Sequence, residues 1–271
     1  MTKIITHNGR AHRDDFLAVC ITLATVDNPA MVIRKEWPSE EELNNPETFV
    51  LDFGKEYNPA KLNFDHHHIV GGEQCAFTLI LEHFGMRDYN AMPWIKYVEV
   101  DDHCGPMATG TLLGNGGKNV KEYLFNPLEE YFIDQFSQKA EMMEGDWLYD
   151  LMKKIGKLIQ TQYLNYQEDK KAIEKCVEIE NYLGFVVAKS STLKRHVWHS
   201  NAFYTFCKEN KVDIIFGSND RGAGAFRLTR RVERIDFNKA AKVEGVKFIH
   251  QSGFLISFDG NWKDIISTCI L

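Results

Sequence analysis

The stretch KIITHNGRAHRDDFLAVCITLA, residues 3–24, joins a short apolar segment to a longer one through a turn. Lys3 to Thr6 has the pattern of a short buried strand, and Asn8 and Gly9 mark the turn that ends it. From Asp14 to Ala24 the apolar residues recur at helical spacing. The stretch therefore predicts a strand followed by a helix, which is the first half of a βαβ unit.

The same alternation continues along the chain. Strands are predicted at residues 31–35 (MVIRK) and 48–54 (TFVLDFG), and a helix is predicted at residues 75–85, where Gly85 is a typical stop. Alternating strands and helices predict an α/β fold with a mostly parallel sheet flanked by helices. We assign residues 1–127 to this domain.

The pattern changes twice after residue 127. Residues 128–182 are helical and acid-rich, with seven Lys and Arg against twelve Asp and Glu and no strand signal, which predicts a helical connector. Strand patterns return at residues 184–190, 213–220, 225–231 and 246–258, so a smaller α/β domain is predicted over residues 183–271. Residues 189–234 carry ten Lys and Arg against four Asp and Glu. Positive charge is therefore concentrated in the second domain.

The composition of the 271 residues limits the class of protein. The net charge of -6 and pI near 5.9 argue against a surface built for long duplex nucleic acid, although a local patch can still bind phosphates. The six cysteines form no CxxC pair, which favours reduced thiols over a zinc knuckle or a disulfide framework. The sequence shows no signal-like start and no run of about 18 apolar residues. We expect a cytoplasmic protein without a membrane partner.

The first strand-to-helix turn holds four chemically active side chains within nine residues: His7, His12, Asp14 and Asp15. In open α/β sheets, ligands bind at the carboxyl ends of strands. One of the two aspartates is explained by a role as helix N-cap. That role leaves both histidines unexplained, so the turn is a candidate site.

Two further strand ends carry polar residues. Asp52 follows an apolar run, where a carboxylate is costly unless it is paired or bound to a cation, although an aspartate there also commonly forms a turn. Asp65 is followed by three histidines, His66, His67 and His68. Side chains of an extended segment alternate between faces, so this run is not one uniform surface. A tag remnant or a chance surface cluster is the alternative.

A helix predicted over residues 93–105 (PWIKYVEVDDHCG) contributes one more carboxylate. Asp101 continues an apolar stripe formed by Trp94, Tyr97 and Val98, so its charge needs a partner. We interpret Asp102 and His103 as solvated neighbours.

These segments together supply nitrogen and oxygen ligands without cysteine. The candidate metal ligands are His7, His12, Asp14, Asp52, His66 and Asp101. Such a set suits a pair of Mn²⁺ ions, with Mg²⁺ as the alternative, better than a closed structural zinc site. Two cations about 3.5 to 4 Å apart can clamp an in-line phosphoryl displacement, which predicts hydrolysis of a phosphoester.

Five motifs occur along the chain in this order: THNGRAHRDDFLA, VLDFGKEYNP, FDHHH, VEVDDHCG and FIHQSGF. They resemble the Myg-one exonuclease family of the DHH phosphoesterase superfamily, densely over residues 1–105 and more thinly in the second domain. The resemblance implies one metal held by His7, His12 and Asp52, and a second held by Asp14, Asp52, His66 and Asp101.

The resemblance also implies roles beside the metals. Asp52 would bridge the two cations, His67 would donate a hydrogen bond to a non-bridging phosphate oxygen, and Asp65 would orient an imidazole. No role follows for His68.

For the second domain, the resemblance implies a smaller body that grips the substrate across a cleft. The candidate substrate-binding residues are Arg221, Arg227, Arg230, His250, Ser252 and Gly253. Glycines near these arginines let the backbone approach a phosphate closely. The alternative is that the arginines form a solvated strand face.

Our leading hypothesis is a metal-dependent phosphodiesterase that removes nucleotides from short or single-stranded RNA or DNA, using water activated by two cations. One alternative is a small-molecule phosphoesterase, such as a phosphatase, a cyclic-dinucleotide hydrolase or a pyrophosphatase. Another is a metal-stabilised binding module without turnover. The sequence leaves the oligomeric state open, with a homodimer as one option.

Overall fold

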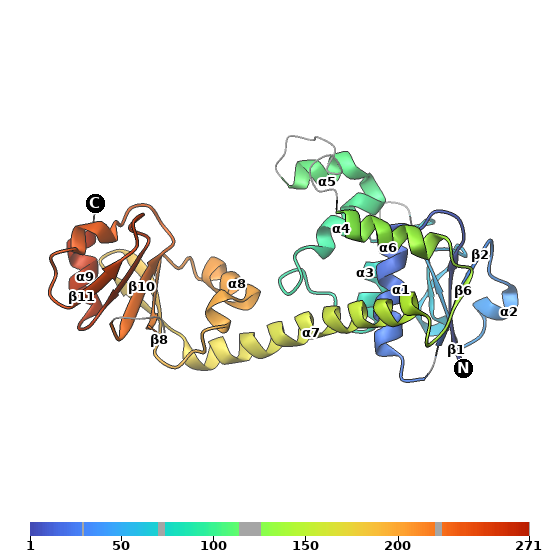
Figure 1. The fold of residues 1–271 in the computed structure, drawn as a ribbon, viewed down its shortest axis with the longest axis horizontal. Coiled ribbons are helices and arrows are strands. Elements are labelled where there is room, and N and C mark those ends of the chain that lie inside the picture. Colours follow the sequence, from blue (N-terminus) through green and yellow to red (C-terminus); the bar gives the residue numbers. More distant parts are fainter. Residues whose placement is uncertain (29, 70–73, 114–125, 220–223, 271) are drawn as a thin grey trace. The chain divides into compact units, whose positions relative to one another are not determined.

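A computed structural model describes residues 1–28, 30–69, 74–113, 126–219 and 224–270 (Figure 1). The chain divides into two compact units, Met1–Leu164 and Asn165–Leu271, and each contains one six-stranded sheet with helices. The α/β fold class is thereby confirmed. The boundary lies inside helix α7 (Trp147–Cys176), so the predicted connector of residues 128–182 is divided between the two units.

The sheet of the first unit has the strand order β4-β5-β3-β1-β2-β6. Its strands are β1 (Thr2–His7), β2 (Ala30–Lys35), β3 (Thr48–Leu51), β4 (Tyr57–Asn58), β5 (Asn63–Phe64) and β6 (Glu141–Met142). The four central strands are parallel, whereas β4 and β6 pair antiparallel at the edges. The two-residue strands β4, β5 and β6 were not predicted, because they are too short to show an alternating pattern. Strand β6 also shows that the predicted connector contains sheet.

The first unit also contains helices (Figure 1). They are α1 (Arg13–Thr25), α2 (Glu40–Leu43), α3 (Ala76–His83), α4 (Ile95–Cys104), α5 (Pro106–Leu112), α6 (Pro127–Ser137) and the first part of α7. Helices α1, α2 and α3 contact the sheet, and α5 contacts α4. Helix α1 is buried along most of its length and contacts α3, α4 and α6. Helix α7 approaches α1 closely at Gly156, where a Cβ atom would lie 1.9 Å from the carbonyl oxygen of Cys20. A side chain at this position would separate the two helices.

The strand order determines where polar residues gather. The chain leaves β1 for β2 on one side and returns to place β3 and then β5 on the other side, so the connections reverse at β1. In open parallel sheets such a reversal opens a crevice at the carboxyl ends of the strands. The carboxyl ends of β1, β3 and β5 are therefore adjacent, and the residues that follow them meet.

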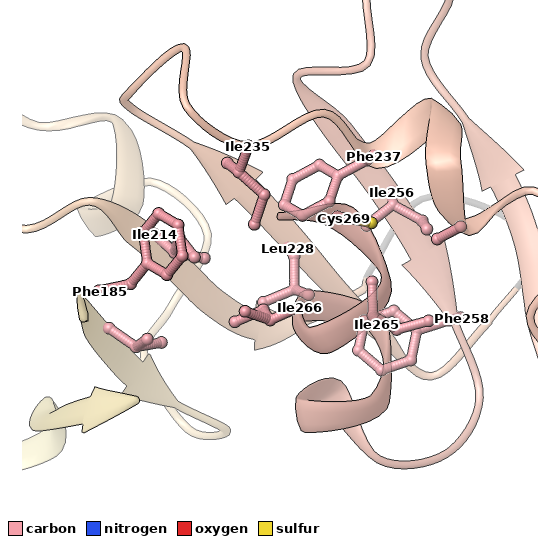
Figure 2. Close-up of a cluster of buried hydrophobic side chains, with 12 residues drawn as sticks. Phe185, Ile214, Leu228, Ile235, Phe237, Ile256, Phe258, Ile265, Ile266 and Cys269 are labelled. Atoms are coloured by element: carbon pink, nitrogen blue, oxygen red, sulfur yellow. The ribbon is translucent and has the colours of Figure 1, made fainter. Parts of the chain in front are cut away.

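The second unit has the strand order β11-β12-β10-β9-β8-β7, in which only β8 and β9 are parallel. Its strands are β7 (Glu178–Tyr182), β8 (Phe185–Ser190), β9 (Ile214–Ser218), β10 (Phe226–Arg230), β11 (Val246–Ile249) and β12 (Leu255–Phe258). Its helices are the end of α7, α8 (Asn201–Glu209) and α9 (Trp262–Cys269). Figure 2 shows the core, in which Leu228 of β10 packs with Ile256 of β12 and Ile266 of α9.

Within the described residues, no helix combines the length and apolar character that a membrane crossing requires. All six cysteines are described and none forms a disulfide bond. Cys20, Cys75, Cys207 and Cys269 are buried, whereas Cys104 is exposed.

Candidate metal centre

His7 and Asp52 meet at the carboxyl ends of the neighbouring strands β1 and β3. His7 is the last residue of β1 and Asp52 directly follows β3. The Nε2 atom of His7 lies 3.4 Å from Oδ2 of Asp52, while its Nδ1 lies 2.8 Å from the carbonyl oxygen of Asn8. Nδ1 can donate to that carbonyl, and Nε2 is the ring atom that faces the carboxylates. A cation bound at Nε2 would therefore leave the hydrogen bond at Nδ1 in place.

The backbone at Asp52 is strained. Its φ of 65° lies in the left-handed region, which costs a non-glycine residue about 1–3 kcal/mol. The backbone N–H of Asp52 donates to the carbonyl of Phe64 on β5, 3.1 Å away. This hydrogen bond holds the turn that directs the side chain into the cluster.

His66 joins Asp52 to helix α4. The Nε2 atom of His66 lies 3.1 Å from Oδ1 of Asp52 and 3.2 Å from Oδ2 of Asp102. Each oxygen of Asp52 thus faces a different histidine. His66 and Asp52 are buried, so their contacts are shielded from water.

The structure places Asp102, not Asp101, beside His66. The inward stripe of α4 consists of Ile95, Val98, Glu99 and Asp102, one residue later than the predicted stripe of Trp94, Tyr97, Val98 and Asp101. A shift of one residue turns a helix face by about 100°. Asp101 instead lies 3.9 Å from Nη1 of Arg13 and accepts a 3.5 Å hydrogen bond from Thr109. The interpretation of Asp102 as solvated was wrong.

Asp14 is fully buried at the start of α1, and neither of its carboxylate oxygens has a hydrogen-bond partner among the described residues. Burial, together with the negative charges of Asp52 and Asp102, raises the pKa of Asp14 well above its usual value. A buried carboxylate without a donor is costly. A cation beside it would remove that cost.

The N-cap of α1 is His12, so the predicted N-cap role of Asp14 or Asp15 was wrong; Asp15 lies at the third helical position and reaches back in a capping box. Its Oδ1 accepts hydrogen bonds from the backbone N–H groups of His12 and Phe16, both at 2.8 Å. Its Oδ2 lies 3.3 Å from Nε2 of His7 and 3.9 Å from Nη2 of Arg34. Burial raises the pKa of Asp15 to about 7, although the charge of His7 acts in the opposite direction. Asp15 therefore completes the capping box of α1 and supports His7.

Asp65 holds the segment that carries His67. Its Oδ2 accepts a 2.6 Å hydrogen bond from the backbone N–H of Lys55, and its Oδ1 accepts from the backbone N–H and Nδ1 of His67 at 3.0 and 2.7 Å. The hydrogen bond to Asp65 raises the pKa of His67 to about 9, more than burial lowers it. Nδ1 is the ring atom that faces Asp65, and the side chain of His67 remains 57% exposed. His68 is exposed.

The charge state of Asp52 follows from its histidines. Burial alone would raise the pKa of Asp52, but the hydrogen bonds from His66 and His7 lower it to about 2. For His7, burial lowers the pKa, while Asp52 and Asp15 outweigh it and raise the value. Burial raises the pKa of Asp102, and the charge of Asp52 adds to that effect. The carboxylates of Asp14 and Asp102 therefore have too little positive charge nearby to balance their own negative charge.

The donor atoms lie close enough together to hold cations. Three overlapping groups each bring their ligand atoms within 4.8 Å of one another. These groups are His7, His12 and Asp52; Asp52, His66 and His67; and His12, Asp14 and Asp102. The first is the predicted set for one metal, and the third includes Asp14 from the predicted second set with Asp102 in place of Asp101. The unpaired oxygens of Asp14 show that these residues fit divalent cations.

A pocket of about 240 Å³ opens beside the cluster. His12, Asp14 and Asp102 line it, together with Arg10 and Arg13. Arg13 also contacts the carboxylate of Glu129 on α6. The pocket gives a small anionic group access to the carboxylates and imidazoles.

The substrate-binding residues predicted in the second unit do not all line one pocket. Arg227 and His250 line one pocket of about 440 Å³. Arg230 donates to the backbone carbonyls of Glu233, Ile235 and Ser252 at 3.3, 2.6 and 3.1 Å, and so holds a turn together.

Ser252 and Gly253 form the turn after His250. The backbone N–H of Ser252 donates to Nδ1 of His250, 3.2 Å away, so the neutral ring carries its proton on Nε2. Gly253 has a φ of 63°, and a Cβ there would lie 2.1 Å from Oδ1 of Asp236. Arg221 lies outside the described residues. A direct role in substrate binding stays a prediction for all six residues.

Three residues of the metal centre were missed or underrated: Asp102, Asp15 and Arg34. Arg34 is buried on β2, where it donates to the carbonyls of Phe136 and Gly9 at 3.0 and 3.2 Å. In MVIRK it lies two residues after buried Val32 and so shares the buried face of the strand, and a basic residue in a predicted central strand was the one available signal.

Comparison with known proteins agrees with the N-terminal motifs. Residues 3–87 match the family model MYG1_exonuc, described as uncharacterised protein family UPF0160. No curated protein matches the chain.

Two solved structures show weak overall similarity. One is described as a member of the s1p family of ribosomal proteins with a DHH domain, with 14% identity, a TM-score of 0.32, and coverage of 98% of this chain and 85% of that chain. The other is an uncharacterized protein from Helicobacter pylori G27, with 12% identity, a TM-score of 0.27, and coverage of 98% and 97%.

Proposed function

We propose that this chain, which belongs over residues 3–87 to the uncharacterised protein family UPF0160, is a divalent-metal-dependent phosphodiesterase acting on short or single-stranded nucleic acid. The name of the family model points to a nuclease, and thus to a phosphoesterase hydrolase. The observation that carries the proposal is Asp52, whose two oxygens face His66 and His7 beside the unpaired carboxylate of Asp14.

The contacts support the ligand set that the resemblance implies, with Asp102 in place of Asp101. His7, His12 and Asp52 would hold one cation, and Asp14, Asp52, His66 and Asp102 would hold the other, with Asp52 shared. When bound, two divalent cations activate water and neutralise charge on the phosphoryl oxygens. Mn²⁺ is our first candidate and Mg²⁺ the second, because the donors are imidazoles and carboxylates without thiolates.

His67 and Asp65 act on the substrate side. Asp65 fixes Nδ1 of His67 and raises the pKa of the imidazole to about 9, so the ring is a cation at neutral pH. The Nε2–H of this exposed ring can then donate to a non-bridging oxygen, and this bond strengthens as charge develops there. Asp65 keeps the ring in this orientation because it is itself anchored by the backbone of Lys55.

The basic part of the second unit supports a nucleotide substrate. Arg227 and His250 share a pocket there, and Lys and Arg outnumber Asp and Glu over residues 189–234. The net charge of -6 for the whole chain favours a short substrate over a long duplex. A small phosphoester is the second candidate, which the 240 Å³ pocket would also admit. A cytoplasmic location remains a prediction, as does the oligomeric state.

The test is the variant Asp52→Asn, assayed with Mn²⁺ on single-stranded oligonucleotides, cyclic dinucleotides, pyrophosphate and bis(p-nitrophenyl) phosphate. We expect wild-type protein to hydrolyse oligonucleotides best, and the variant to lose hydrolysis of all of them while its circular dichroism stays unchanged. Asp27→Asn, which changes an exposed aspartate of the same unit, is the matched control. Near wild-type hydrolysis by Asp52→Asn would exclude this mechanism.

If pyrophosphate or a cyclic dinucleotide is the preferred substrate, the small-molecule alternative replaces the nuclease. Bound metal without hydrolysis of any phosphoester would instead show a binding module.

A further inference from the structure

The second unit has one sheet face that α9 does not cover. Leu228 of β10 points into the core with α9 (Figure 2). Because side chains alternate along a strand, Arg227 points to the opposite face. Arg227 is paired in register with Gly217 of β9 and Ser257 of β12, which share that face. A pocket of about 440 Å³ lies on this face, and Arg227 and Ser257 line it.

Trp198 forms a fixed wall of the pocket. It is buried, and its indole N–H donates to the carbonyl of Leu193 at 3.1 Å. The absence of a side chain at Gly217 makes room for the indole, because a Cβ there would lie 2.9 Å from its Cζ2 atom. The wall is therefore formed by the fold itself.

Two phenylalanines at the pocket are unusually exposed. Phe248 is 52% and Phe254 is 37% accessible, although both are large apolar rings. Phe254 and His250 form a T-shaped pair with ring centroids 4.5 Å apart, and the backbone of Ser252 contacts that imidazole. Exposed rings gathered around a hollow are typical of a ligand site.

The combination of rings and charge defines the ligand. Phe248 and Phe254 offer flat apolar faces, Arg227 offers a permanent cation that suits a phosphate, and Thr229 and Ser257 offer hydroxyl groups. A ligand that uses all of them has a flat heterocycle and an anionic group. A nucleotide has both, and about 440 Å³ lies within the range of roughly 300–1,000 Å³ usual for small-molecule pockets.

We propose that this pocket binds one unpaired nucleobase of the substrate, with the ring stacked on Phe248 or Phe254 and the adjacent phosphate on Arg227. The choice of a nucleotide over other flat anions rests on the proposed function. Because a base inside a duplex has no free face, the pocket restricts the substrate to single strands, strand ends or mononucleotides.

The test measures binding by the full chain in EDTA, where hydrolysis plays no part. Isothermal titration compares AMP and CMP with ribose 5-phosphate and inorganic phosphate. We expect the two nucleotides to bind at least tenfold more tightly than ribose 5-phosphate. Phe248→Leu and Phe254→Leu should each weaken AMP binding at least fivefold, since stacking on one ring contributes about 1–3 kcal/mol per base.

Tyr204→Leu is the control, because it removes an exposed ring of the same unit outside the pocket and should bind AMP like the wild type. If Phe254→Leu fails to fold, the more exposed Phe248→Leu decides the result. Ribose 5-phosphate binding as tightly as AMP, or unchanged AMP binding by the phenylalanine variants, would overturn the proposal. AMP binding that depends on these rings in a protein that hydrolyses no phosphoester would reject the proposed function and leave the pocket intact.

Discussion

The carboxylate of Asp102 lies 3.2 Å from Nε2 of His66 and thereby connects helix α4 to the segment after β5. His66 also contacts Asp52, so one imidazole links residues from three segments of the chain. Asp102 belongs to the inward stripe of α4 with Ile95 and Val98, and packing of these apolar residues fixes its direction. The candidate metal centre thus depends on the rotation of one helix.

The first prediction compares the two adjacent aspartates of α4. Asp102→Asn should lower kcat/KM for phosphodiester hydrolysis at least 100-fold, because it removes a charge that faces His66 and Asp14. Asp101→Asn should lower it less than tenfold, because Asp101 contacts Arg13 and Thr109 instead. Steady-state kinetics with saturating Mn²⁺ provide the measurement. The reverse order of the two losses would restore the assignment of Asp101.

Sequence patterns predicted the strands that deliver the site but not the rotation of α4. The strand ends at His7 and Asp52 follow apolar runs, and parallel strands bring such ends to one edge, so their proximity could be predicted. In VEVDDHCG, by contrast, either aspartate can continue an apolar stripe, since Trp94 and Ile95 are both apolar. In the structure α4 packs against α1 and Ile95 is fully buried, and this choice depends on tertiary packing that the segment alone does not encode.

The contacts of buried Arg34 beneath the site were even harder to predict from the sequence. Arg34 lies in an ordinary strand pattern, and its partners Phe136 and Gly9 are 102 and 25 residues away. Local patterns describe neighbours within a few positions, whereas these contacts exist only after the sheet and α6 assemble. The same applies to the pocket of the second unit, where Trp198 meets Gly217 across the fold.

The second prediction concerns metal binding and stability. Mn²⁺ should raise the melting temperature of the wild-type protein, because the carboxylate of Asp14 is buried without a hydrogen-bond donor in the described structure. A ligand at about 100 times its Kd stabilises the folded state by about 2.7 kcal/mol. Differential scanning calorimetry with EDTA or Mn²⁺ measures the shift. In Asp14→Asn the shift should fall by at least half, and a full shift in this variant would place the cation elsewhere.

The third prediction concerns thiol reactivity and pH. Burial raises the pKa of Cys207 and of Cys269 from the ordinary 9.0 to about 11, so about one thiol in a thousand is ionised at pH 8. Iodoacetamide should therefore modify the exposed Cys104 first, as read by peptide mass spectrometry of the native protein. The neutral buried thiols stabilise the second unit fully below about pH 9, and this contribution is lost as pH rises toward 11. Equal labelling of Cys104 and Cys207 at pH 8 would contradict the burial.

The last prediction compares two neighbouring cations on β2. Arg34→Met should destabilise the first unit by about 3–5 kcal/mol, because it removes the donor to two backbone carbonyls and a permanent positive charge 3.9 Å from buried Asp15. Lys35→Met should cost about 1 kcal/mol or less, because the side chain of Lys35 is 35% exposed and its ion pair with Glu42 is partly solvated. Urea unfolding of both variants, followed by circular dichroism, gives the two free energies. Losses of equal size would mean that Arg34 does not stabilise the fold beneath the metal centre.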